Sequence, residues 1–156
     1  MSELRPELGQ AIRGYFADHE LGDVESETIL CCETTSHKKQ VGRLQAWLRG
    51  DLDATVHTAL VLTPQWLLWV RSGDRSGPGL TAAQLTMIQA RPYRSLLTGA
   101  TGLESFGYSG DSSHRLRGYI GLGTDPAAQK FCAAVQQAIA QVSPPPRKGL
   151  LGWLGG

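Results

Sequence analysis

The sequence has no apolar run long enough to cross a bilayer, which takes about 20 predominantly apolar residues. Its most apolar stretch, residues 59–70, is interrupted by Thr63, Pro64 and Gln65. The first residues are amphipathic and acidic, and they lack the basic start and apolar run of a secretory signal. We therefore expect a cytoplasmic protein.

Cysteine is scarce as well. The chain has three cysteines, Cys31, Cys32 and Cys132, which are too few and too unevenly spaced for a disulfide framework. Neighbouring residues of a strand point to opposite faces, so Cys31 and Cys32 cannot hold one ion together without distortion. We interpret them as small apolar residues of a strand and expect no metal site.

Motifs that identify catalysis are also missing. The sequence contains neither a GxxxxGK[ST] phosphate loop nor an HExxH pair, and no serine or cysteine stands in a recognisable nucleophile turn. His37, His57 and His114 fall on or beside three predicted strands; we interpret them as polar surface residues, although they could meet in space. We predict no catalytic residues, no cofactor and a protein that is not an enzyme.

The net charge is small but unevenly distributed. A formal charge of +1 gives no overall attraction to nucleic acid, so a nucleic-acid partner is not expected. Residues 1–33 carry eight acids and two bases, whereas Lys38, Lys39, Arg43 and Arg49 form a basic run without an acid. This run is the candidate site for an anion or a lipid head group, and a solvated strand end is the simpler alternative.

What the chain does contain is enough residues for one domain and many turn formers. Its 156 residues are 41% hydrophobic and include 19 glycines and 8 prolines, which disfavours an all-helical fold. The segments TVHTALVL and WLLWVRS predict a hairpin, because both are rich in β-branched and aromatic residues. Pro64 predicts its turn at residues 63–66. Since both segments are almost continuously apolar, we expect both faces of this sheet to be at least partly covered.

The other elements follow from periodicity and capping. One amphipathic helix is expected over residues 3–20. A second begins at Asp125, an N-cap followed by Pro126, and continues to Val142, before a proline run. Pro92 limits the strand that precedes it or places that strand at an edge. The remaining expected segments are strands at 27–39, 80–91, 101–110 and 114–123, a turn at 111–113 and a long connection at 41–54. In the strand at 114–123, alternation predicts one core face with Leu116, Ile120 and Leu122 and one solvent face with Arg115, Arg117 and Tyr119.

Three segments resemble bacterial pleckstrin-homology-like (PH-like) and GRAM-type domains: ALVLTPQWLLWVR, QLTMIQARP and GYIGLGTDPAAQKFCAAVQQAI. The resemblance implies an α+β, mainly β fold, in which a bent antiparallel sandwich or partial barrel is capped by the C-terminal helix, with an extra N-terminal helix. It implies an N-terminal helix packed on the domain (1–22), a PH-like domain (23–142) and a proline-rich linker with an apolar tail (143–156). It further implies that Phe131, Val135 and Ile139 pack against Leu60, Leu62, Leu68 and Val70.

Candidate residues for contact with a protein lie in three places. The tail follows a stiff polyproline spacer, and its apolar residues fold back onto the domain, dock into a partner or a second copy, or make a shallow contact with a membrane interface. Trp47, in the long connection, could receive the tail. Trp66 and Trp69 would mark a contact surface if either were exposed. The tail residues are Leu150, Leu151, Trp153 and Leu154.

We therefore predict a non-enzymatic PH-like binding or scaffolding module that contacts a protein partner, or a second copy of itself, through sheet edges or the tail. The resemblance also implies an alternative, weak binding to an anionic membrane or a phosphorylated ligand, because basic residues of the first loop face the lipid head group in PH domains that bind phosphoinositides. A small-ligand carrier with a cavity in the bent sheet is the second alternative.

Overall fold

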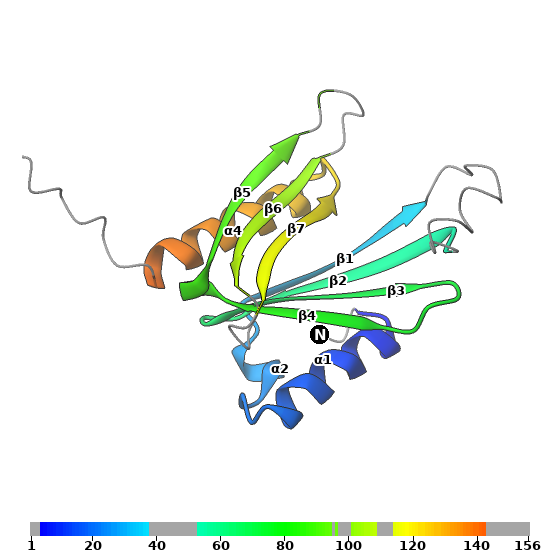
Figure 1. The fold of residues 1–156 in the computed structure, drawn as a ribbon, viewed down its shortest axis with the longest axis horizontal. Helices are drawn as coiled ribbons and strands as arrows, with labels where there is room; N and C mark the ends of the chain where they lie inside the picture. The colour runs from blue at the N-terminus through cyan, green and yellow to red at the C-terminus, as the bar shows by residue number, and fades with distance from the viewer. Residues whose placement is uncertain (1–3, 38–52, 95, 97–100, 109–113, 143–156) are drawn as a thin grey trace, which may run out of the picture.

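The computed structural model describes residues 4–37, 53–94, 96, 101–108 and 114–142. It is an α+β structure, mainly β, as predicted, and its two antiparallel sheets do not close into a barrel within these residues (Figure 1). The four-stranded sheet has the order β1 (Leu30–His37), β2 (Thr55–Leu62), β3 (Trp66–Gly73), β4 (Gly79–Gln84). The three-stranded sheet has the order β5 (Ile88–Arg94), β6 (Thr101–Tyr108), β7 (Arg115–Leu122). The helices are α1 (Pro6–Asp18), α2 (Val24–Glu27) and α4 (Pro126–Val142), with a 3₁₀ turn, η1, at Leu85–Met87.

The predicted hairpin forms between β2 and β3, with its turn at the predicted residues. The Thr63 backbone N–H donates to the Trp66 carbonyl at 2.9 Å. The Thr63 Oγ1 accepts from the Trp66 backbone N–H at 3.0 Å and from that of Gln65 at 3.3 Å. The turn therefore depends on the fully buried Thr63 hydroxyl as well as on Pro64.

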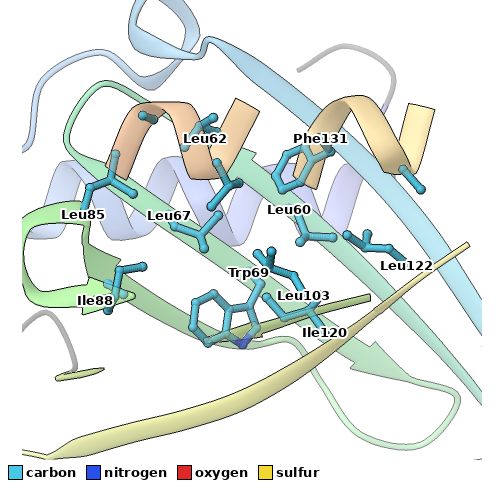
Figure 2. Close-up of a cluster of buried hydrophobic side chains, with 14 residues drawn as sticks. Leu60, Leu62, Leu67, Trp69, Leu85, Ile88, Leu103, Ile120, Leu122 and Phe131 are labelled. Atoms are coloured by element: carbon cyan, nitrogen blue, oxygen red, sulfur yellow. The ribbon is translucent and has the colours of Figure 1, made fainter. Parts of the chain in front are cut away.

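Both faces of the four-stranded sheet are covered, as the apolar hairpin predicted. One face meets α4 and the three-stranded sheet, and its buried cluster, here the α4-side core, includes Leu60, Leu62 and Phe131 (Figure 2). The other face meets α1. Its cluster, the α1-side core, includes Leu8, Ile12, Phe16, Val24, Ala59, Val61, Leu68 and Val70.

The alternation of side chains corrects one predicted set of contacts. Leu68 and Val70 pair with Val61 and Ala59 in the antiparallel register, and all four point toward α1. Successive residues of a strand face opposite ways, so these two cannot share the side of Leu60. The β3 residues that belong to the α4-side core are instead Leu67 and Trp69.

The strand predicted at residues 80–91 is two strands that belong to different sheets. The η1 turn separates β4 from β5, and the Leu85 backbone N–H donates to the Gln65 carbonyl at 2.8 Å. Because the Leu85 side chain is fully buried, the chain is anchored where it changes sheets. Pro92 lies within β5, an outer strand of its sheet, which confirms the edge position.

The helices begin where local chemistry favours them. Helix α4 spans the predicted residues, and Asp125 caps it by accepting from the Ala128 backbone N–H at 2.9 Å. Helix α1 is shorter than predicted, because it begins at Pro6 and ends at Asp18. The backbone N–H of Arg5, which precedes the helix, donates to the Glu33 carboxylate. The predicted connection at 41–54 lies almost entirely outside the described residues, and the turn at 111–113 lies wholly outside them.

Candidate functional site

Most residues selected from the sequence as binding candidates lie outside the described residues, so those assignments stay predictions. They are Lys38, Lys39, Arg43, Trp47, Arg49, Leu150, Leu151, Trp153 and Leu154. Among the helices that the structure describes, none is long and apolar enough to cross a membrane.

The two remaining candidates are packing residues. Trp66 is 9% exposed and belongs to the α1-side core, and Trp69 is 7% exposed and belongs to the α4-side core. Strand β3 is covered on both faces, so neither indole offers a contact surface. The exposure that would have marked them as binding residues is not found.

Two of the three histidines considered above share one surface. His37 and His57 lie on the same face of β1 and β2, where the Thr55 Oγ1 is 3.4 Å from the Nδ1 of His37 and the Thr35 Oγ1 is 3.0 Å from that of His57. His114 stands before β7, in the other sheet. Over the part of the chain that the structure describes, no group of three His, Cys, Asp or Glu residues could hold a metal ion.

A pocket of about 320 Å³ opens between one end of the three-stranded sheet and the first half of α4. Here β5 ends, β6 begins and β7 leads into the helix. The residues that line the pocket are Pro92, Tyr93, Arg94, Thr101, Gly102, Leu122, Gly123, Thr124, Ala128, Gln129, Cys132, Ala133 and Gln136.

The wall of this pocket is apolar and its rim is polar. Leu122 and Ala128 are buried, whereas the guanidinium-bearing Arg94 and the amide-bearing Gln136 are exposed at the edge. Burial raises the pKa of the Cys132 thiol, so the sulfur is protonated at neutral pH. The pocket is suited to an apolar side chain or small molecule with a polar end at the rim.

Strand β5 runs into this pocket at the edge of its sheet. Among the described strands it pairs with β6 only, and Pro92 pairs with Leu103 in the register. Helix α4 packs beside the same strand. Since Pro92 has no N–H to donate, an added strand could pair with only part of this edge.

The outer face of the three-stranded sheet carries a second feature that sequence reasoning missed. Glu104, 12% exposed, accepts from Arg91 Nε at 3.0 Å and Nη2 at 2.9 Å, and it lies 3.5 Å from Arg117 Nη2. Both guanidinium groups lie over the Phe106 ring, at 4.9 and 5.6 Å from its centroid. One carboxylate and one ring thus contact both arginines.

Two tyrosines extend this surface. The rings of Tyr93 and Tyr119 meet edge to face with centroids 4.8 Å apart, and the Tyr119 hydroxyl donates to the Thr101 carbonyl at 3.0 Å. Partial burial, with a smaller effect of Tyr93, raises the pKa of Tyr119. The alternation of β7 had predicted that Arg115, Arg117 and Tyr119 face solvent, and the structure confirms this, but only strand pairing brings Arg91, Tyr93 and Glu104 beside them.

Comparison with known proteins gives no family for this chain: no family model matches it, and neither does any curated protein or solved structure.

Proposed function

We propose that the chain is a non-enzymatic binding module of PH-like architecture that captures an extended segment of a partner protein. The segment would lie along the open edge of β5 and place an apolar side chain in the pocket beside α4. The order of elements, four antiparallel strands, three more and a final helix, supports this architecture.

The observation that carries the proposal is the position of the pocket at the end of an edge strand. Extended peptides that add to a sheet gain affinity from main-chain hydrogen bonds and specificity from pockets for alternate side chains. Because Pro92 shortens the available ladder, the pocket must supply a large part of the affinity. The protonated Cys132 thiol is a poor nucleophile, which favours binding over covalent chemistry at this site.

A filled-pocket variant tests the proposal. Ala133 is an exposed residue of α4 that lines the pocket, and Ala140 is an exposed residue of the same helix that does not. Peptides would be selected from a random displayed library against the wild-type protein, and their affinities measured by fluorescence polarisation on A133W and A140W. Burying one large apolar side chain contributes about 1.5–3 kcal/mol, so we expect A133W to weaken binding by about tenfold or more and A140W to leave it unchanged.

Two outcomes would contradict the proposal. The selection could yield no peptide that binds the wild-type protein in solution, or the selected peptides could bind A133W as well as A140W. Thermal unfolding of both variants would first show that each is folded.

The pocket volume also favours a second candidate function, a carrier for a small apolar ligand. About 320 Å³ lies at the lower end of the range for small-molecule sites, roughly 300–1,000 Å³. Native mass spectrometry of freshly purified protein would detect a bound mass that disappears on denaturation and is absent from A133W. If wild-type protein and A133W carry the same mass, the ligand does not occupy this pocket.

A further inference from the structure

The outer face of the three-stranded sheet is an exposed surface of arginine and tyrosine side chains. Helix α4 packs against the opposite, inner face, where it joins Leu103 and Ile120 in the α4-side core. Six large hydrophobic side chains are exposed in the part of the chain that the structure describes, and three of them, Tyr93, Tyr108 and Tyr119, lie on this outer face. Each of the three is about 40% exposed. So much exposed ring surface on one sheet marks an interaction surface.

This surface, the arginine face, is cationic. Arg91, Arg115 and Arg117 outnumber Glu104, which leaves a formal net charge of +2. Arg91 is already held by Glu104 and Phe106, so little side-chain freedom remains to be lost when an anionic group binds it. The surface therefore fits a partner that carries carboxylates beside an apolar residue.

The same chain carries such a surface where α1 ends and α2 begins. Five exposed acids fall within residues 18–27, and Arg13 pairs with one of them, Glu25, at 2.7 Å. Ile29, which follows α2, is 54% exposed. This region, the acidic corner, comprises Asp18, Glu20, Asp23, Glu25, Glu27 and Ile29.

The two surfaces cannot meet within one molecule. The four-stranded sheet lies between them, because α1 and α2 cover one of its faces and the three-stranded sheet packs on the other (Figure 1). Their charges are complementary and each has exposed apolar side chains at or beside the charged groups. Contact between them requires a second molecule.

We propose that the arginine face of one copy binds the acidic corner of a second copy, so that the protein associates head to tail. An open assembly then has one unoccupied arginine face at one end and one unoccupied acidic corner at the other. It can therefore add further copies in a chain or close into a ring. The contact uses the outer face of the three-stranded sheet, which shares Tyr93 with the lining of the pocket beside α4 but does not require the pocket to be filled, so it goes beyond the peptide binding proposed above. Since exposed ion pairs are screened at separations of about 10 Å in 0.1 M salt, the association weakens as salt is added.

Charge reversal at each surface tests the proposal while the shorter ion pair of that surface is kept. R115E/R117E changes the arginine face and keeps the closer pair of Arg91 with Glu104. D18K/E27K changes the acidic corner and keeps Asp23, whose carboxylate caps α2, and the pair of Arg13 with Glu25. The matched control for R115E/R117E is R71E/R75E, which changes the net charge by the same amount at two exposed residues of the four-stranded sheet and its β3–β4 loop.

The measurement is sedimentation velocity over a wide range of protein concentration, at about 0.02 M and about 0.5 M salt. We expect the wild-type protein and R71E/R75E to associate with rising concentration at low salt and to dissociate at high salt. Each reversal variant alone should remain monomeric. An equimolar mixture of R115E/R117E with D18K/E27K should associate again, into pairs, because the unchanged acidic corner of R115E/R117E can meet the unchanged arginine face of D18K/E27K.

Three results would overturn the proposal. The wild-type protein could remain monomeric at low salt up to the highest concentration, in which case an acidic segment of another protein becomes the better partner for the arginine face. Association could persist at high salt or in both reversal variants, which would assign it to another surface. The mixture could fail to associate although circular dichroism shows both variants folded, and the two surfaces would then not face each other.

Discussion

Cys31 and Cys32 are neighbours in β1, and the face of the strand on which each lies decides which core its side chain contacts. Cys32 packs against the α4-side core, where burial, together with the nearby thiols of Cys31 and Cys132, raises its pKa to about 12. Cys31 points the other way and packs against the α1-side core. The interpretation of both as small apolar residues is confirmed by this packing, and at neutral pH Cys32 is a protonated, unreactive thiol.

The raised pKa of Cys32 predicts a loss of stability in alkali. Between its ordinary pKa of 9.0 and its folded value of about 12, the folded state retains a proton that the unfolded state releases. Stability therefore falls as pH rises through this window, by at most about 1.4 kcal/mol per pH unit for one proton, and this thiol has no effect below pH 9. Urea unfolding of the wild-type protein and of Cys32→Ala from pH 7 to about pH 11 measures the difference. If the two free energies decline in parallel, the raised pKa is refuted.

Thr63 is a residue whose side chain stabilises the turn between β2 and β3. Its hydroxyl accepts from two backbone N–H groups of the β2–β3 turn, at 3.0 and 3.3 Å. Thr63→Val keeps the shape and removes the acceptor, so at least one buried N–H loses its partner; we expect a loss of about 1–3 kcal/mol in the free energy of unfolding. Thr63→Ser should recover most of it in the same urea titration. A Thr63→Val variant as stable as the wild-type protein would show that the hydroxyl contributes nothing to the turn.

At the scale of elements, α4 is the part of the fold that its own sequence specifies best. The Asp125 cap, Pro126 in the first turn and the apolar stripe together predict its bounds, and the structure has the same bounds. Helix propensity and capping act over a few residues, so tertiary contacts are not needed to place the ends. The β4–β5 segment is specified less well by its own sequence. Its pattern predicts one strand, whereas in the structure η1 divides it into two.

The cap of α4 gives a prediction at this scale. Asp125→Ala removes the acceptor for the Ala128 backbone N–H and should lower the free energy of unfolding by about 0.5–2 kcal/mol. Asp125→Asn keeps a side-chain oxygen at the same position and serves as the control. Chemical denaturation followed by far-ultraviolet circular dichroism measures both. A cap without energetic importance would leave the alanine variant as stable as the asparagine variant.

At the scale of the whole molecule, one sheet is shared by two cores. The α1-side and α4-side cores lie on opposite faces of β1 to β4, and the same strands supply residues to both. A change in either core alters the packing of the sheet that the other core requires. The described elements should therefore unfold as one unit.

Two phenylalanines test this cooperativity. Phe16 in the α1-side core is 2% exposed and Phe131 in the α4-side core is fully buried, so replacing either with alanine should lower the free energy of unfolding by about 3–5 kcal/mol. Both variants should keep a single transition with coincident fluorescence and circular dichroism signals. Gln137→Ala, at an exposed position of α4, is the control and should change stability by less than about 0.5 kcal/mol. Two separated transitions in Phe16→Ala would show that α1 unfolds independently.

The sequence by itself determined the features that depend on neighbours along the chain: the mainly β class, the β2–β3 hairpin with its turn and the bounds of α4. Strand alternation also predicted which residues of β7 face solvent. Only the tertiary structure decided which side of the sheet each apolar residue meets, because a register must be fixed before Leu68 and Leu67 can be assigned to opposite cores. The pocket and the arginine face likewise join residues from separate strands and from α4, and no local pattern records which segments fold beside one another.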